Sequence, residues 1–307
     1  PEDFEDILNL GGTILGTSRC PFNKMRVIEN GFDKVAAMKK TYQKLKLDCL
    51  AILGGNGSLK TANLLSQEGL NVIGLPKTID NDTWGTDYTF GFQSAIDIAT
   101  RYLDEIQTTA ASHSRVFVVE IMGHKVGHIC LSAGIAAGAD IILLPEIPYD
   151  IEVVAGEIEK KVKAGKKHIV IACAEGAISK EESLLSKKQY KLKVATREGH
   201  SVVYEIANKL SHYIDKEIRV SCAGHAQRGG QPCAYDREIS TLFGIEGAKL
   251  IMNKDFGKLV VFVNHRLDAI PLEETAGKLK YVDVQGDTVK NAKLMGISFG
   301  DEMTLSK

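Results

Sequence analysis

GLPKTIDND, residues 74–82, is the stretch of sequence that decides the fold, together with GGNGS at residues 54–58. Each stretch follows a short apolar run, at 49–53 or 72–75, bounded by glycine or proline, which is typical of a buried parallel strand. Both stretches therefore lie on loops at strand ends, where open α/β sheets bind ligands. One loop offers backbone N–H groups, and the other offers a lysine, a hydroxyl and two carboxylates. Together they suit a phosphate group and a hydroxyl that must lose a proton to attack it.

The composition favours a large globular protein and excludes several classes of function. The 307 residues, 44% of them hydrophobic, can bury a substantial core, and we expect two lobes. A formal net charge of −1 gives no electrostatic case for binding nucleic acid or an acidic membrane. No apolar run reaches the roughly 20 residues of a membrane helix, and no signal segment opens the sequence. The six cysteines form no CxxC pair, so we expect reduced thiols and a cytoplasmic protein.

Strand-like and helix-like segments alternate along the chain. Apolar runs predict strands at 47–53, 71–75, 116–121, 141–144, 169–173 and 218–223, and a hairpin at 258–263 and 269–272. Amphipathic spacing predicts helices at 2–10, 30–46, 58–68, 94–106, 126–137, 151–164, 198–213, 237–252 and 288–295, and the lysine-rich stretch 179–193 is typical of an exposed excursion. This alternation predicts an α/β fold with mainly parallel sheets. No linker rich in Pro, Gly or Ser is present, so we expect the two lobes to be interleaved.

The pair of aspartates in TIDND is the most specific chemical signal. In an extended chain, residues two apart face the same side, so Asp80 and Asp82 would converge. One carboxylate could then accept a hydroxyl proton while the other organises a metal or orients its neighbour. An Asx-rich turn contains the same residue types, but Lys77 beside the pair favours a functional site. The glycine-rich run alone fits an anion-binding helix N-terminus and a plain capped turn equally well.

Polar side chains also gather at the ends of three other expected strands. They are Arg115, His124, Glu175, Arg219, His225 and Arg228, and Met122 and Gly123 stand directly before His124. Taken singly, each polar residue fits a surface charge or a satisfied histidine as well as a ligand. Taken together, they supply the bidentate donors and the hydroxyl acceptor that a sugar phosphate requires.

Four motifs, GLPKTIDND, GTDYTFGF, MGHKVG and GHAQRGGQPCAYDR, resemble those of the 6-phosphofructokinase family. The resemblance runs from GGTILGTSR near the start to the closing segment. It implies two interleaved three-layer αβα lobes with the site in the cleft. A phosphoryl-donor-binding lobe would comprise 1–91 plus 228–278, and a sugar-phosphate-binding lobe 92–227 plus 279–307. It also implies phosphoryl transfer to the 1-hydroxyl of fructose 6-phosphate in glycolysis, by a homotetramer or homodimer with shared active sites.

The resemblance further implies a role for each motif residue. Asp80 would be the general base, with Thr78, Asp82 and His124 at the transferring phosphate. The sugar site would be lined by Met122, Gly123, Glu175, His225 and Arg228, and Arg115 and Arg219 would reach a substrate on a neighbouring subunit. The phosphoryl donor would contact Arg19, Cys20, Gly55, Asn56, Gly57, Ser58 and Lys77. The metal, Mg²⁺, would be held by Asn56 and Asp82.

Two positions bear on the identity of the donor. Pyrophosphate enzymes of the family typically carry aspartate and lysine where this chain has Gly57 and Lys77, and most bacterial ATP enzymes carry glycine at both. Gly57 leaves room for the α-phosphate of a nucleotide, so we expect ATP as co-substrate, with pyrophosphate as the alternative.

The chain also departs from the family pattern. Asn56 replaces a metal-binding aspartate, and His124 replaces an arginine that contacts the transferring phosphate. The first strand and its GGGD-type phosphate loop are absent. We expect a shortened chain, because a sheet without a central strand would expose an apolar edge. These departures motivate a further alternative, a catalytically impaired sugar-phosphate-binding or regulatory subunit.

Overall fold

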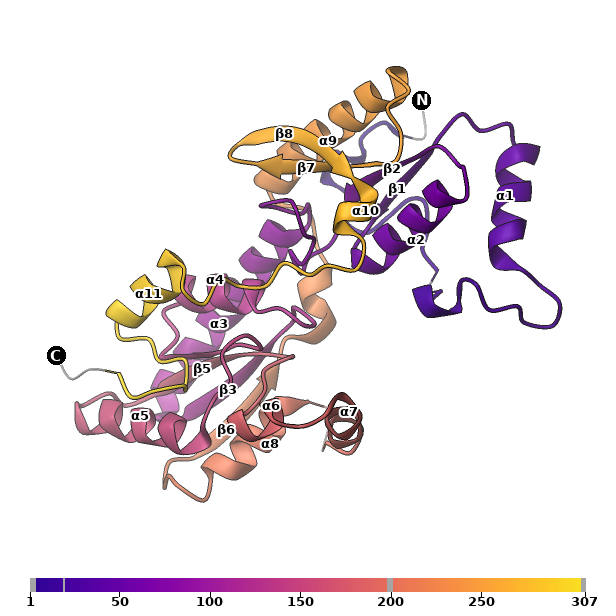
Figure 1. Cartoon of the computed structure of the whole chain (residues 1–307). Coiled ribbons are helices and arrows are strands. Elements are labelled where there is room, and N and C mark those ends of the chain that lie inside the picture. Colours follow the sequence, from indigo (N-terminus) through magenta and orange to yellow (C-terminus); the bar gives the residue numbers. More distant parts are fainter. Residues whose placement is uncertain (1–3, 19, 198–200, 305–307) are drawn as a thin grey trace. The chain divides into compact units, whose positions relative to one another are not determined.

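The chain divides into two compact units, each built from two segments of the sequence (Figure 1). The structure, a computed structural model, describes residues 4–18, 20–197 and 201–304. Unit 1 comprises Pro1–Ser94 and Gly230–Lys280, and unit 2 comprises Ala95–Gly229 and Tyr281–Lys307. Both contain a mostly or wholly parallel sheet, so the predicted α/β fold class is confirmed. None of the helices in the described ranges is long and apolar enough to span a membrane.

The sheet of unit 1 has four strands in the order β1-β2-β7-β8. They are β1 (Leu50–Gly54), β2 (Val72–Pro76), β7 (Lys258–Val263) and β8 (Arg266–Pro271). β1 and β2 are parallel, with Leu50 opposite Val72 and Gly54 opposite Pro76, so the loops that follow them leave the same edge of the sheet. β7 is parallel to β2 and forms the predicted hairpin with β8 (Figure 1).

Helices cover both faces of this sheet. On one face, α2 (Asn56–Gln67) and α10 (Leu272–Thr275) pack Leu59 and Leu272 against Val72. On the other, α9 (Ala234–Met252) packs Phe243 against Ile73. Successive residues of β2, a strand buried throughout, therefore supply two cores. The remaining elements of unit 1 are α1 (Lys34–Lys44) and the 3-10 helices η2 (Ile7–Asn9) and η3 (Phe22–Lys24).

The sheet of unit 2 is wholly parallel, in the order β4-β5-β3-β6. Its strands are β3 (Val116–Ile121), β4 (Ile141–Leu143), β5 (Ile169–Ala174) and β6 (Ile218–Cys222). The helices α5 (Ile151–Lys163) and α8 (Val202–Leu210) share one hydrophobic core with the sheet. The opposite face is covered by α4 (His128–Ala136), where a Cβ on Gly134 would touch Ile142 and Ala172. Further elements are α3 (Phe92–His113), which starts in unit 1, η5 (Gly224–Arg228) and α11 (Asp287–Leu294).

Three segments differ from the prediction. The α-helix expected at 2–10 is wrong: its described residues form only 3-10 structure, at Phe4 and in η2. Phe4, Leu8 and Leu10 are more than half exposed, so no buried face supports a longer helix. The lysine-rich stretch 179–193, which was expected to be an exposed excursion, contains two helices, α6 (Lys180–Ser183) and α7 (Lys187–Ala195), and each begins with a capping box. The helix expected at 198–213 is observed as α8, and its predicted residues 198–200 lie outside the described part of the chain.

A buried ion-pair cluster ties α6 and α7 to α8. Glu182 is 3% exposed, and its carboxylate pairs with Arg197 at 2.6 Å and Lys193 at 3.0 Å. Glu205 of α8 lies 3.2 Å from both of these cations. Burial raises the pKa of Glu182, but hydrogen bonds from the Ser179 N–H, Arg197 and Lys193 outweigh burial and hold the pKa below its ordinary value.

Glu182→Gln tests the contribution of this cluster. We expect it to lower the free energy of unfolding at pH 7 by about 2 kcal/mol, because Arg197 and Lys193 lose one of the two carboxylates that pair with them and keep only Glu205. The contribution of Glu182 is complete above its unfolded-state pKa of about 4.3 and is lost as pH falls through the lower folded-state pKa. Urea denaturation between pH 7 and pH 3 should therefore show a shallower loss of stability for the variant. The exposed Glu159, paired with Lys163, is the control, and Glu159→Gln should cost under about 0.5 kcal/mol. Equal losses for the two variants would contradict this account.

Candidate active site

The glycine-rich loop of unit 1 connects β1 to α2. Gly55 is the N-cap residue, so Asn56, Gly57 and Ser58 form the first helical turn. The N–H groups of a first turn have no partner within their helix, which makes a helix N-terminus attractive to anions. A Cβ on Gly57 would meet no described atom within 4 Å, so the turn is open on this side. The loop can therefore accept an anionic group.

The Thr78–Asp82 loop follows β2 and lies against the glycine-rich loop. A Cβ on Gly55 would lie 3.3 Å from the Thr78 Cβ, which is closer than ordinary van der Waals contact. The Thr78 Oγ1 accepts a hydrogen bond from the Asp80 N–H at 3.1 Å, and the Thr89 hydroxyl donates to the Thr78 carbonyl at 2.7 Å. The two stretches that were predicted to form one site are thus brought together at the carboxyl edge of one sheet.

The backbone between the two aspartates is not extended. Asn81 has a φ of 53°, in the left-handed region, so the extended geometry from which we predicted convergence of the carboxylates is wrong here. Asparagine is among the few residues that adopt this conformation at low cost. Asp82 is 7% exposed and Asp80 is half-buried. The directions of both carboxylates therefore depend on the turn at Asn81 and not on strand alternation.

The other residues of unit 1 that were predicted to contact the phosphoryl donor have different surroundings. Lys77 is exposed, and its N–H donates to the Gly54 carbonyl at 3.1 Å, which joins the two loops again. The Asn56 amide donates to the Lys278 carbonyl at 2.7 Å. Cys20 is exposed, and no hydrogen bond joins it to the loops within the described ranges. Arg19 lies outside the described residues.

Asp236 holds the segment behind the Thr78 loop, although the sequence analysis did not select it. It is 3% exposed and accepts hydrogen bonds from the N–H groups of Gly91 at 2.9 Å and Ser94 at 2.7 Å. The Ser94 hydroxyl also donates to it at 2.5 Å. The carboxylate of one helix, α9, thereby caps the start of another, α3. The YDR at the end of the GHAQRGGQPCAYDR motif was the only signal for this role in the sequence.

Two of the predicted site residues that follow β3 are held by Glu175, which follows β5. The Glu175 Oε1 accepts hydrogen bonds from the N–H groups of Gly123 at 3.2 Å and His124 at 2.6 Å. A Cβ on Gly123 would lie 2.5 Å from the Val126 carbonyl oxygen, so only glycine fits there. The structure thus brings together Glu175, Gly123 and His124, while one carboxylate oxygen of Glu175 is used on the backbone.

Gln227 is a residue of this edge that the sequence analysis missed. It is 2% exposed, and its Oε1 accepts a hydrogen bond from the Met122 N–H at 3.2 Å. Its position inside GHAQRGG was the available signal. The neighbouring His225 and Arg228, on η5, are exposed. Gln227 therefore fixes η5 to the end of β3 and leaves these two side chains accessible.

Arg115 and Arg219 lie at the opposite end of the unit 2 sheet from Met122 and Glu175. Arg115 precedes β3 and Arg219 begins the neighbouring β6, whereas Met122 follows β3. Six strand residues separate the two ends, which at about 3.3 Å per residue is roughly 20 Å. Both guanidinium groups pair with Glu217, Arg115 through Nε at 2.5 Å and Arg219 through an η nitrogen. Hydrogen bonding by Arg115 lowers the pKa of Glu217.

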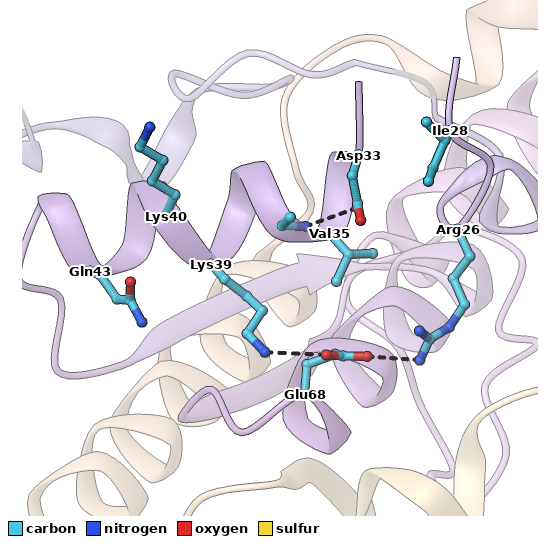
Figure 2. A pocket seen from close by; sticks show the side chains of 9 residues that line it. Arg26, Ile28, Asp33, Val35, Lys39, Lys40, Gln43 and Glu68 are labelled. Atoms are coloured by element: carbon cyan, nitrogen blue, oxygen red, sulfur yellow. Dashed lines mark hydrogen bonds and ion pairs between the residues drawn. The ribbon is translucent and has the colours of Figure 1, made fainter. Parts of the chain in front are cut away.

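A cavity of about 410 Å³ in unit 1 contains none of the predicted site residues. Figure 2 shows Lys39 and Arg26 pointing toward Glu68 from two sides, at 3.2 Å and 2.9 Å. The Asp33 carboxylate on its wall caps α1 by accepting the Ala36 N–H. The two acidic groups of this cavity, Asp33 and Glu68, are therefore already engaged with an amide or with cations.

A second cavity, of about 350 Å³, runs beside α2 in unit 1. One side of the helix supplies Lys60, Asn63, Leu64 and Gln67, which recur at helical spacing. Phe22, Arg26, Ala276 and Gly277 complete its lining. The cavity lies along the same helix whose first turn carries Asn56, Gly57 and Ser58.

The described residues include no cluster of three or more His, Cys, Asp or Glu side chains arranged to hold a metal. Mg²⁺ in phosphoryl-transfer sites commonly takes one or two carboxylates, substrate phosphates and water. Asn56 uses its amide N–H₂ on Lys278, so the side-chain oxygen remains its possible metal ligand. One amide oxygen and one carboxylate, the ligands predicted at Asn56 and Asp82, are fewer than the six ligands of Mg²⁺, so a bound ion would depend on substrate phosphate and water to complete its coordination.

Comparison with known proteins points to one family. A sequence model described as Phosphofructokinase matches residues 1–251. A Spirochaeta thermophila protein named ATP-dependent 6-phosphofructokinase is 49% identical over 305 residues, with 98% of this chain and 83% of the relative covered. A Bacteroides thetaiotaomicron protein named ATP-dependent 6-phosphofructokinase 3 is 42% identical, with 96% of this chain and 82% of the relative covered.

Solved structures show the same similarity of fold. The structure of phosphofructokinase from Saccharomyces cerevisiae matches with a TM-score of 0.75 and 28% identity, covering 98% of this chain and 40% of that chain. A pyrophosphate-dependent phosphofructokinase from Marinobacter aquaeolei matches with a TM-score of 0.71 and 22% identity, covering 94% of this chain and 70% of that chain. The second match, at this identity, bears on the fold alone.

Asp236→Asn tests whether the carboxylate that caps α3 stabilises unit 1. The substitution keeps the shape but turns an amide N–H₂ toward buried donors, so we expect a loss of about 2 kcal/mol in the free energy of unfolding. Chemical denaturation at pH 7 measures this loss. Asp268→Asn is the control, because Asp268 is exposed and its carboxylate accepts, within the described part of the chain, a single hydrogen bond, from the adjacent Ala269 N–H at 2.7 Å. Unchanged stability of the Asp236 variant would contradict the capping role.

Proposed function

The chain belongs to the phosphofructokinase family, and from that premise we propose that it is an ATP-dependent 6-phosphofructokinase of the cytoplasm. It transfers the γ-phosphoryl group of ATP to the 1-hydroxyl of fructose 6-phosphate, a glycolytic step. The observation that carries the proposal is the close approach of the Thr78 side chain to Gly55, where an added Cβ would lie only 3.3 Å from the Thr78 Cβ. This contact puts an anion-attracting helix N-terminus beside a loop with two carboxylates, as phosphoryl transfer requires.

Two features support ATP over pyrophosphate as the donor. The turn at Gly57 is open, and the second cavity lies farther along the same helix, beside Lys60 and Asn63, where we propose that the nucleoside part of ATP binds. A donor that lacks a nucleoside would leave that cavity without use. The relatives from Spirochaeta thermophila and Bacteroides thetaiotaomicron both carry ATP-dependent in their names. Lys77, typical of pyrophosphate enzymes, is exposed and remains compatible with either donor.

In the proposed mechanism Asp80 is the general base. It accepts the proton of the sugar 1-hydroxyl as that oxygen attacks the γ-phosphorus. The bond from the γ-phosphorus to the β,γ-bridging oxygen breaks and ADP leaves, while Thr78 and Asp82 orient the transferred group. His124 acts as a hydrogen-bond donor to the same group, a role assigned from the family resemblance. Positioning and charge neutralisation supply most of the rate enhancement in such reactions. Mg²⁺, held by Asn56 and Asp82 with the donor phosphates, would supply charge neutralisation when bound.

The sugar phosphate is proposed to use both ends of the unit 2 sheet, but in different subunits. Met122, Gly123, Glu175, His225 and Arg228 would bind the sugar of one substrate. Arg115 and Arg219 lie roughly 20 Å from that edge, so they cannot reach the same molecule within one chain. We therefore propose a homodimer or homotetramer in which these arginines bind the 6-phosphate of a substrate on a neighbouring subunit. Both guanidinium groups pair with the Glu217 carboxylate, which supports the proposal that the two arginines can bind one anion together.

Glu217→Gln tests this use of the arginine pair. The 6-phosphate must replace the Glu217 carboxylate, so removing its charge should lower the KM for fructose 6-phosphate by roughly twofold to fivefold. Steady-state kinetics at fixed ATP measure the change. Glu246→Gln, which breaks an exposed pair with Lys249 on α9, should leave the KM unaltered. A higher KM for the Glu217 variant would contradict competition and would mean that the carboxylate instead orders the arginines for binding.

Asp80→Asn tests the proposed base and, with the wild type, the function itself. We expect kcat to fall by about 100- to 10,000-fold while fructose 6-phosphate still binds, because the amide cannot accept the proton. A coupled assay for fructose 1,6-bisphosphate with ATP or pyrophosphate gives kcat, and calorimetry gives binding. Asp104→Asn, an exposed substitution on α3, should have no effect.

The same assay decides between the alternatives. Turnover by the wild type with ATP but not with pyrophosphate supports the proposal, and the reverse preference supports a pyrophosphate enzyme. Binding of fructose 6-phosphate without turnover from either donor would support a sugar-phosphate-binding subunit, the reading that Asn56 and His124 motivate.

A further inference from the structure

The turn that separates the two aspartates is held by a lysine from a distant part of the sequence. Lys280 is partly buried, and its Nζ donates to the Asn81 Oδ1 at 2.9 Å. It also donates to the backbone carbonyls of Thr86 at 2.8 Å and Asp87 at 2.7 Å. An ammonium group has three donors, and all three are used on the loop that begins at Asn81.

The backbone around Lys280 reinforces this attachment. The Lys280 N–H donates to the Asp82 carbonyl at 3.0 Å, and Leu279 forms an antiparallel bridge with Thr83. The Asn81 amide donates to the Asp87 carbonyl at 3.1 Å, which is the carbonyl that Lys280 also contacts. The backbone N–H and the side chain of Lys280 therefore both bind the segment from Asn81 to Asp87.

The chemistry of the contact favours a positively charged donor over a neutral one. Three oxygen atoms, one from an amide side chain and two from the backbone, converge on a single point, where an ammonium is the matching group. Burial lowers the pKa of Lys280 to about 8, and the carboxylates of Asp87 and Asp82 act in the opposite direction. Asn81 is 4% exposed and carries the left-handed φ that sets the directions of Asp80 and Asp82.

We propose that Lys280 is a positioning residue for the phosphoryl transfer, in that its ammonium fixes the left-handed turn at Asn81 and thereby the carboxylates of Asp80 and Asp82. The proposal rests on the proposed function. Lys280 acts through Asn81 and takes no proton from the substrate. Because a displacement of about 1 Å at a reacting group can cost about 100-fold in rate, loosening the turn should affect the chemical step more than substrate binding.

Lys280→Met is the direct test, since it keeps the length of the side chain and removes all three donors. At pH 7 we expect kcat with ATP to fall by roughly 30- to 100-fold, with the KM for fructose 6-phosphate and for ATP changed by less than about threefold. Lys258→Met is the matched control, because Lys258 is a partly exposed lysine of the same unit that pairs with Asp255 at 2.6 Å. The control should retain the wild-type kcat. A Lys280 variant with kcat within twofold of wild type would overturn the proposal.

A second variant keeps the test decisive if Lys280→Met does not fold. Asn81→Gly retains access to the left-handed region but removes the side chain that Lys280 contacts, so it should lower kcat in the same selective way. Where both single variants fold, the double variant should lose no more than the greater single loss. A normal kcat for Asn81→Gly, or fully additive losses, would overturn the role of Lys280. Wild-type turnover in the same assay separates this result from failure of the proposed function.

Discussion

The parallel pairing of β1 with β2 is the constraint on which the rest of unit 1 depends. Its register sets Gly54 opposite Pro76, so the two following loops leave the sheet side by side. The absence of a side chain at Gly55 leaves room for the Thr78 side chain, since an added Cβ would lie 3.3 Å from the Thr78 Cβ. A shift of one residue in this register would turn the buried side chains of β2 to the wrong faces. Core packing therefore determines how close the glycine-rich loop and the Thr78–Asp82 loop lie to one another.

Long-range polar contacts complete what the sheet begins. Lys280 closes the loop that carries the aspartates, and Asp236 caps the helix that follows that loop. In unit 2, Glu175 and Gln227 hold the end of β3 in the same manner, by accepting hydrogen bonds from its backbone. Each of these side chains comes from a different segment of the chain than the backbone it holds. The loops are thus fixed by buried polar groups, which are costly to leave unpaired.

The sequence predicted the strands, most helices and the parallel fold, because apolar runs and helical spacing report burial directly. It also predicted that the TIDND and glycine-rich stretches meet, since both follow parallel strands. It did not predict the left-handed turn at Asn81, because alternation assumes an extended chain. The roles of Lys280, Asp236 and Gln227 were missed for another reason. A single charged or amide residue forms no recognisable pattern in the sequence, and its hydrogen-bond partner is known only from the fold. The prediction of an N-terminal helix at 2–10 was wrong because helical spacing of apolar residues does not guarantee that a surface is present for them to pack against.

Hydrogen–deuterium exchange of the wild-type protein, with and without a non-hydrolysable ATP analogue, tests most directly whether the two loops of unit 1 act as one donor site. The account predicts that amides in 54–58 and in 77–82 become protected together, at the same analogue concentration, while the exposed helix α7 is unaffected. Protection of only one loop, or of neither at a saturating concentration, would contradict it.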